Sequence, residues 1–181
     1  MPIKKHHYMF YAGFTIIEML TVITIMILLI TIAIPGWRNF VQNNQAMAIS
    51  SKLTGALSLA RATAIQSGYN VVLCPTTYQT GTTCLNNPAN WNSLILFIDI
   101  NGNGTYEAGT DTLVKYYYDL PSGIIKVTSG NSPATFTPAG FYTPAAGITF
   151  TIKPTGCVGN NGRTITIMPS GNIQANFTSC P

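Results

Sequence analysis

A single glutamate interrupts an otherwise apolar stretch near the start of this 181-residue chain. Glu18 lies five residues after Gly13, and the residues from Phe14 to Ile34 carry no other charge. A carboxylate in hydrocarbon is unfavourable by at least a few kcal/mol on insertion scales, and such residues usually have a function and a partner. The partner that fits is a positive amine, which cleavage between Gly13 and Phe14 would create at the new terminus.

Four cysteines provide a second chemical possibility, and their even number in an exported chain favours two disulfides. Of the three possible pairings, the least demanding joins Cys74 to Cys84 across a short loop and Cys157 to Cys180 across a C-terminal hairpin. A zinc site is disfavoured, because no Cys-x-x-Cys pair occurs and no histidine lies beyond residue 7. We therefore expect no metal site.

The segment from Asp99 to Glu107 has oxygen-bearing side chains at alternate positions, among them Asn101 and Asn103, and a glycine at the sixth. An EF-hand calcium loop opens in this way. The twelfth position is Thr110 rather than glutamate, however, and Asn-Gly pairs are also strong turn signals. We favour a structural turn, with calcium binding as the alternative.

No catalytic set is apparent in the chain. His6 and His7 precede Gly13 and would be lost on cleavage, and the later carboxylates form no obvious pair. Charged residues make up 8% of the chain, the net charge is +4, and no run of basic residues occurs, so a strong electrostatic footprint for nucleic acid is absent. We expect neither an enzyme nor a cofactor.

The elements that position these residues begin with the apolar stretch itself, whose length suits a bilayer core about 30 Å thick. Lys4 and Lys5 precede it, which predicts a cytoplasmic N-terminus and an external body. After a bend at Pro35, the helix should continue to a stop at Gly68. We expect Lys52 and Arg61 on its solvent side, opposite an apolar face formed by Ile49, Leu53, Ala56, Leu57, Ala60 and Ala64.

Short strands are expected beyond Gly68, and the predicted fold class is α+β, with one long helix packed on an antiparallel sheet. Segment 128–147, which is rich in proline, glycine, serine and threonine, is expected to be a long exposed loop. A hairpin turn is expected at 169–172. The strands are predicted at 71–73, 94–98, 113–118, 124–127, 148–152, 163–168 and 173–177.

The residues from Gly13 to Leu20, Gly-Phe-Thr-Ile-Ile-Glu-Met-Leu, resemble the class III signal of type IV prepilins and type II secretion pseudopilins. The resemblance implies that a prepilin peptidase cuts after Gly13 and methylates Phe14. Glu18 would then pair with the terminal amine of a neighbouring subunit during assembly. Pro35 lies where many type IV pilins carry a helix-bending proline.

The same resemblance implies a pilin-like domain organisation. A cleaved leader would occupy residues 1–13, a transmembrane and filament-core helix 14–35, an amphipathic helix 36–68, and a β-rich periplasmic head 69–181. The protein would lie in the bacterial inner membrane as a single-pass protein and then enter a filament. A plain anchor that is never cut would explain the length of the apolar stretch but not Glu18.

The second half of the chain is similar to the GspH/FimT branch of minor pilins and pseudopilins. The similarity lies in the segment from Leu57 to Pro75, in the Asn-Gly repeats after Asp99, and in the late Gly162-Arg163. It implies a minor pilin that helps to initiate or cap pilus assembly. Its partners would be other major and minor pilins, the prepilin peptidase and the inner-membrane assembly platform. A pseudopilin of type II secretion is the alternative.

Some FimT-type minor pilins bind DNA, and a Gly-Arg-x-Arg stretch near the C-terminus is associated with this activity. Here Gly162-Arg163 is followed by Ile165 at the position of the second arginine. Lys153 and Arg163 could form a small DNA-binding patch, but one arginine supplies one phosphate contact where several are usually needed. A solvated strand arginine is the interpretation that we favour.

Overall fold

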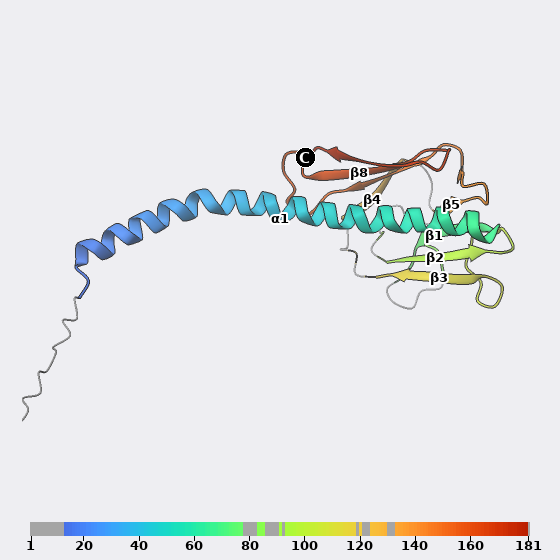
Figure 1. Cartoon of the computed structure of the whole chain (residues 1–181), viewed down its shortest axis with the longest axis horizontal. Coiled ribbons are helices and arrows are strands. Elements are labelled where there is room, and N and C mark those ends of the chain that lie inside the picture. Colours follow the sequence, from blue (N-terminus) through green and yellow to red (C-terminus); the bar gives the residue numbers. More distant parts are fainter. Residues whose placement is uncertain are drawn as a thin grey trace, which may run out of the picture. The chain divides into compact units, whose positions relative to one another are not determined.

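The computed structural model describes residues 13–77, 83–85, 91, 93–118, 120, 124–129 and 133–180 (Figure 1). The chain divides into two compact units, Met1–Arg38 and Asn39–Pro181, which are described separately below. The elements in chain order are α1 (Ile16–Ser67), β1 (Asn70–Pro75), β2 (Leu94–Asp99), β3 (Thr112–Tyr117), β4 (Ile125–Ser129), β5 (Ala134–Phe136), β6 (Tyr142–Thr143), β7 (Ile148–Ile152), β8 (Gly162–Ile167) and β9 (Ile173–Thr178).

The first unit, in its described part, contains residues 13–15 and the start of α1. Every side chain from Phe14 to Ile34 is exposed, and this part of α1 is long and apolar enough to cross a membrane. The helix is continuous through residue 35, so the proline there does not end it.

In the second unit, α1 buries one face and ends where the sequence predicted. The apolar residues at three- and four-residue steps are all buried, which confirms the predicted face: Ile49, Leu53, Ala56, Leu57, Ala60 and Ala64, with Ala46 in addition. Gly68 has φ +74° and donates its N–H to the Ala64 carbonyl at 3.1 Å. Glycine tolerates this left-handed backbone, which closes a helix C-terminus.

The first sheet is antiparallel, in the order β3-β2-β1-β5-β6. Its inner strands are buried on both faces, because α1 and the second sheet cover one side and a separate apolar cluster covers the other. Val71 and Leu73 of β1 belong to the main core, whereas Val72 and Cys74 pack in the second cluster with Phe97. Burial on both faces explains why β1 and β2 read as continuous apolar runs.

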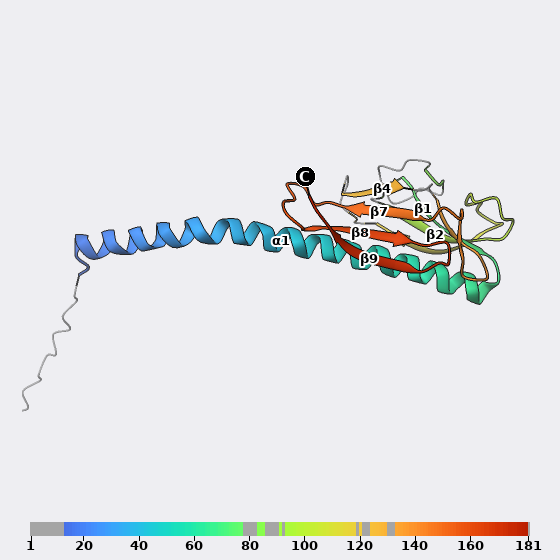
Figure 2. The ribbon, with the colours of Figure 1, turned by 90° about the horizontal axis from the view of Figure 1, so that it is seen from above.

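The second sheet is also antiparallel, in the order β4-β7-β8-β9, and Figure 2 shows these strands side by side. In β7, Ile148, Phe150 and Ile152 are buried while the threonines between them are half-buried. This alternation is what a sheet with one face on the core requires. The predicted turn is confirmed, because the Met168 N–H donates to the Asn172 carbonyl at 2.9 Å where β8 turns into β9.

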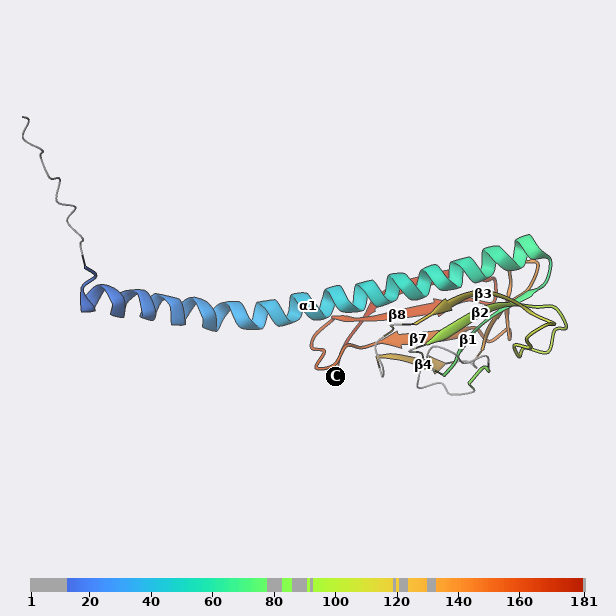
Figure 3. The same ribbon diagram turned by 90° about the horizontal axis from the view of Figure 1, so that it is seen from below.

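One core joins these three layers of the second unit. Side chains from α1, from β1 and β2, and from β7 and β8 form a single buried cluster, and Figure 3 shows this part of α1 running along the strands. Within this core, Trp91 packs edge-on against Phe150, with ring centroids 4.6 Å apart. The α+β prediction is therefore confirmed.

The prediction of a long exposed loop at 128–147 is wrong. Within this segment, β5 pairs with β1 and β6 pairs with β5. Ala134, Phe136 and Tyr142 are buried in the main core. Strands of two or three residues are too short to show a clear alternation in a segment rich in proline and glycine. They form because β5 pairs with β1, which is far away in the chain, and β6 pairs with β5.

Candidate processing and assembly site

The predicted cleavage position lies just before the start of α1. Gly13, Phe14 and Thr15 are outside regular secondary structure and exposed, with 80% of the Phe14 surface accessible. Exposed, non-helical segments are where proteases preferentially cut, so this peptide bond is accessible. Residues 1–12 of the predicted 1–13 leader lie outside the described residues.

Thr15 and Glu18 form a reciprocal cap on the first turn of α1. The Thr15 N–H donates to Glu18 Oε2 at 3.4 Å, and the Glu18 N–H donates to Thr15 Oγ1 at 3.3 Å. In such a capping box, two side chains three residues apart satisfy N–H groups that a helix leaves without partners. Sequence reasoning missed the cap, although Thr-x-x-Glu before an apolar run is its signature.

The cap determines where the Glu18 carboxylate lies. The carboxylate contacts the N–H of Thr15, which is the residue directly after Phe14. It also lies at the positive end of the α1 dipole, which favours a negative charge. An amine created at Phe14 would therefore form one residue away from a backbone group that Glu18 already contacts.

The threonines of the apolar stretch satisfy their hydroxyl groups within the helix. Thr21, Thr24 and Thr31 each donate to a backbone carbonyl three or four residues earlier, at 2.8 Å. A hydroxyl without a partner would be costly in an apolar environment. Glu18 therefore remains the one charged side chain on this exposed apolar surface from Phe14 to Ile34.

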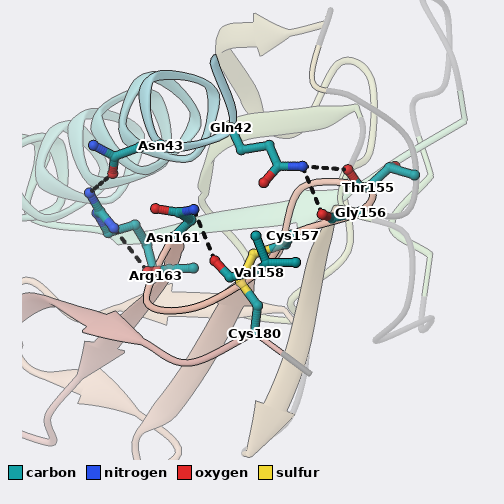
Figure 4. Close-up of a disulfide and its surroundings, with 10 residues drawn as sticks. Gln42, Asn43, Thr155, Gly156, Cys157, Val158, Asn161, Arg163 and Cys180 are labelled. Atoms are coloured by element: carbon teal, nitrogen blue, oxygen red, sulfur yellow. Dashed lines mark hydrogen bonds between the residues drawn. A yellow bond between two sulfur atoms is a disulfide. The ribbon is translucent and has the colours of Figure 1, made fainter. Parts of the chain in front are cut away.

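A set of polar contacts, which we call the clasp, joins α1 to the C-terminal part of the second unit (Figure 4). Gln42 Nε2 donates to the Gly156 carbonyl at 2.7 Å, and Arg163 Nη2 donates to Asn43 Oδ1 at 2.7 Å. The Arg163 guanidinium also lies 3.8 Å from the centre of the Phe177 ring. Sequence reasoning did not identify Gln42 and Asn43 as contact residues, because nothing in the sequence places them opposite residues 156 and 163.

The clasp corrects the interpretation of Arg163 as a solvated strand residue. Only 5% of its surface is exposed, because it lies on the same face of β8 as the buried Ile165 and Ile167. The hydrogen bond that Arg163 donates to Asn43 Oδ1 offsets part of the cost of burying its charge. Arg163 therefore does not present a guanidinium to the surface beside Lys153, and DNA binding stays a prediction.

Both disulfides of the least demanding pairing are present. Cys74 is bonded to Cys84 and Cys157 to Cys180, with Cα atoms 5.5 Å apart in each pair. The second bond lies beside the clasp (Figure 4). It ties the segment after β7 to the chain end, where the Cys180 N–H also donates to the Gly159 carbonyl at 2.7 Å.

Arg61 holds two turns against α1, so its predicted place on the solvent side is wrong. The side chain is half-buried, and it donates to the Gly140 carbonyl at 3.0 Å and to the Ser170 carbonyl at 3.2 Å. Gly171 has φ +76°, and a Cβ at this position would collide with the Gly140 carbonyl. Only glycine lets the two turns approach this closely.

The segment after β2 forms the predicted turn toward β3. Asp99 accepts hydrogen bonds from the N–H groups of Gly102 and Gly104 at 2.8 Å, and Asp111 accepts one from Glu107 at 2.8 Å. These carboxylates therefore organise the backbone of the turn. Among the residues that the structure describes, no three His, Cys, Asp or Glu side chains are grouped to hold a metal.

Comparisons with known proteins agree with this architecture. Residues 50–171, about two thirds of the chain, match the family described as type II transport protein GspH. The fold is similar to that of the type IV minor pilin FimU of Pseudomonas aeruginosa, solved in two crystal forms. One form is 20% identical with a TM-score of 0.54 and covers 72% of this chain and 91% of FimU. The other is 19% identical with a TM-score of 0.57 and covers 76% and 92%.

No curated protein matches the sequence. At these identities the likeness to FimU shows the fold alone, so the family rests on the match over residues 50–171. The long helix with an exposed apolar start and the antiparallel sheets fit that family. The chain belongs to the GspH family, which comprises minor pilins and pseudopilins.

Proposed function

We propose that this chain is a minor subunit of a type IV pilus that helps to initiate or cap pilus assembly. The observation that carries the proposal is the exposed apolar surface of α1, which begins at the processing position and holds Glu18 as its one charge. An apolar surface of this size needs lipid before assembly and neighbouring helices after it. FimU, which shares the fold, is a type IV minor pilin.

The mechanism is assembly rather than catalysis. The precursor inserts into the inner membrane with its leader in the cytoplasm, and prepilin peptidase hydrolyses the peptide bond between Gly13 and Phe14. The new amine of Phe14 is methylated and keeps its positive charge. The Glu18 carboxylate then pairs with the processed terminal amine of a neighbouring pilin, which sets the register of the helices as the subunit leaves the assembly platform.

A pseudopilin of type II secretion is the second candidate, and the description of the matching family favours it. The two candidates use the same helix and the same processing, so they differ only in which machine fails without the protein. Deletion of the gene should abolish surface pili if the first candidate is right. It should instead leave exported enzymes in the periplasm if the second is right.

The processing step has a direct test in Gly13. A bulky residue at this position, as in Gly13→Leu, should block cleavage and leave a precursor that is longer by the 13-residue leader. Gly55→Leu is the matched control, because Gly55 is also exposed with open space where a side chain would be added. Mature Gly13→Leu protein at wild-type levels would contradict the proposal.

A further inference from the structure

We propose that a pocket on the outer face of the second sheet binds a phosphate group. The pocket has a volume of about 550 Å³, which lies within the usual range for small-molecule sites. It is lined by Lys126 and Thr128 of β4, by Thr151 of β7, and by Lys153 and Pro154 directly after β7. Its function is separate from the assembly role of α1.

The strand register brings the two lysines together. Lys126 is paired with Thr151, and Lys153 lies two positions further along on the same face. The Lys153 N–H also donates to the Ile124 carbonyl at 3.0 Å, which extends the pairing of β4 and β7 up to this residue. Lys126 and Lys153 are therefore diagonal neighbours, within reach of one shared ligand.

The second sheet offers no negative side chain to balance these lysines. Residues 120–181 contain no aspartate and no glutamate, so none of the strands β4, β7, β8 and β9 carries an acidic residue. Like charges on neighbouring strands repel each other. A bound anion would remove this repulsion, and the buried Ile124 and Cys157 in the pocket wall would strengthen its attraction to the lysines by lowering the local dielectric.

The two threonines add a neutral donor beside the lysines. Thr128 Oγ1 and Thr151 Oγ1 are 3.0 Å apart, so one hydroxyl donates to the other. The Thr128 hydroxyl can donate either to the Thr149 carbonyl, at 3.3 Å, or to Thr151. When it donates to Thr151, the hydroxyl hydrogen of Thr151 is left for a ligand in the pocket. Two ammonium groups and one hydroxyl match the several acceptor oxygens of a phosphate group.

Two sources could supply this phosphate group. Gly156 lines the pocket, and its carbonyl accepts a hydrogen bond from Gln42. In the sequence, Gln42 comes only seven residues after Pro35, just beyond the end of the apolar stretch. A lipid headgroup at the membrane surface is therefore one source, and free phosphate in solution is the other. Both would be held by the same side chains.

The test uses the full chain in a neutral detergent, titrated with inorganic phosphate and with short-chain phosphatidylglycerol. Amide resonances of Thr151 and Lys153 should shift and saturate for at least one of these ligands. The pocket variant Lys126→Gln/Lys153→Gln should weaken binding at least about tenfold, and Thr151→Val should weaken it less. The matched control, Lys52→Gln/Lys115→Gln, loses two exposed lysines elsewhere and should bind like the wild type.

The titration identifies the source of the phosphate group and also tests the pocket as its binding site. Saturation with inorganic phosphate indicates a soluble ligand, and saturation with phosphatidylglycerol but not with phosphatidylcholine of the same chain length indicates a lipid headgroup. The proposal is overturned if neither ligand shifts these resonances. It is also overturned if the pocket variant and the control variant lose binding to the same extent.

Discussion

The Nη2 atom of Arg163 lies 2.7 Å from the Oδ1 atom of Asn43, and this hydrogen bond joins residues 120 positions apart in the chain. Arg163 comes from β8 and Asn43 from α1, so the contact ties the second sheet to the helix. The arginine is almost fully buried, and its charge therefore depends on this partner, on the Gly162 carbonyl and on the Phe177 ring. The clasp thus holds these elements together by polar contacts, alongside the apolar core.

Replacement of Asn43 by alanine should destabilise the protein. The change leaves a buried guanidinium donor without its acceptor, and the expected loss in the free energy of unfolding is about 1–3 kcal/mol. Asn44→Ala is the control. Asn44 is the exposed neighbour of Asn43, so its replacement should change the free energy of unfolding by less than about 0.5 kcal/mol. Urea unfolding of the full chain, followed by the fluorescence of the buried Trp91, measures both. Equal stability of the two variants would contradict the role of the clasp.

Loss of the Cys157–Cys180 disulfide should also lower stability. In the chain-entropy model, a bond between residues 23 positions apart contributes roughly 3 kcal/mol. The variant Cys157→Ser/Cys180→Ser should therefore unfold at lower urea concentration and exchange amide hydrogens faster around residues 155–159. The comparison is with wild-type protein kept oxidised. Indistinguishable exchange in this segment would show that the bond does not hold the clasp.

Stability should fall at high pH because of Tyr142. Burial raises the pKa of Tyr142 to about 12 from its usual 10.0. The unfolded chain therefore loses this proton first, and the contribution of Tyr142 is complete below pH 10 and is lost as the pH rises to about 12. The loss is up to roughly 2–3 kcal/mol. Tyr142→Phe should show a shallower decline in unfolding free energy over this range, and parallel curves would refute the assignment.

Two replacements of Glu18 separate its charge from its cap. Glu18→Gln keeps a side chain that can accept from the Thr15 N–H but removes the charge, whereas Glu18→Ala removes both. If the carboxylate pairs with a neighbouring amine, both variants should be cleaved normally and both should be incorporated into filaments at least about tenfold less. The measurement is the amount of protein in sheared pili relative to membranes. Wild-type incorporation of Glu18→Gln would show that only the cap matters.

The regular parts of the fold were predictable because their signals are local. The alternation of Ile148, Phe150 and Ile152 in β7 comes from the period of a strand that is covered on one face. The stop at Gly68 comes from the left-handed backbone that glycine tolerates. The four cysteines predicted two disulfides but left three pairings open, and the structure has the least demanding one, in which each bond closes a short segment of chain.

The parts that sequence reasoning missed depend on partners far away in the chain. β5 is three residues long and is ordered by its pairing with β1. In the sequence, Arg163 looks like any exposed strand arginine, because its partner Asn43 is 120 positions away. Arg61 likewise looks like an exposed helix residue, because the Gly140 and Ser170 carbonyls that it contacts come from two distant turns. The cap between Thr15 and Glu18 is different, because its Thr-x-x-Glu spacing is a local signal that the sequence itself carries.

The mass of the N-terminal peptide of the native protein tests the central claim most directly. If proteolysis creates the amine that Glu18 needs, this peptide begins at Phe14 and carries one methyl group on its amine. If the native protein instead retains the residues before Phe14, then no such amine exists, and the proposed role of Glu18 in filament assembly is contradicted.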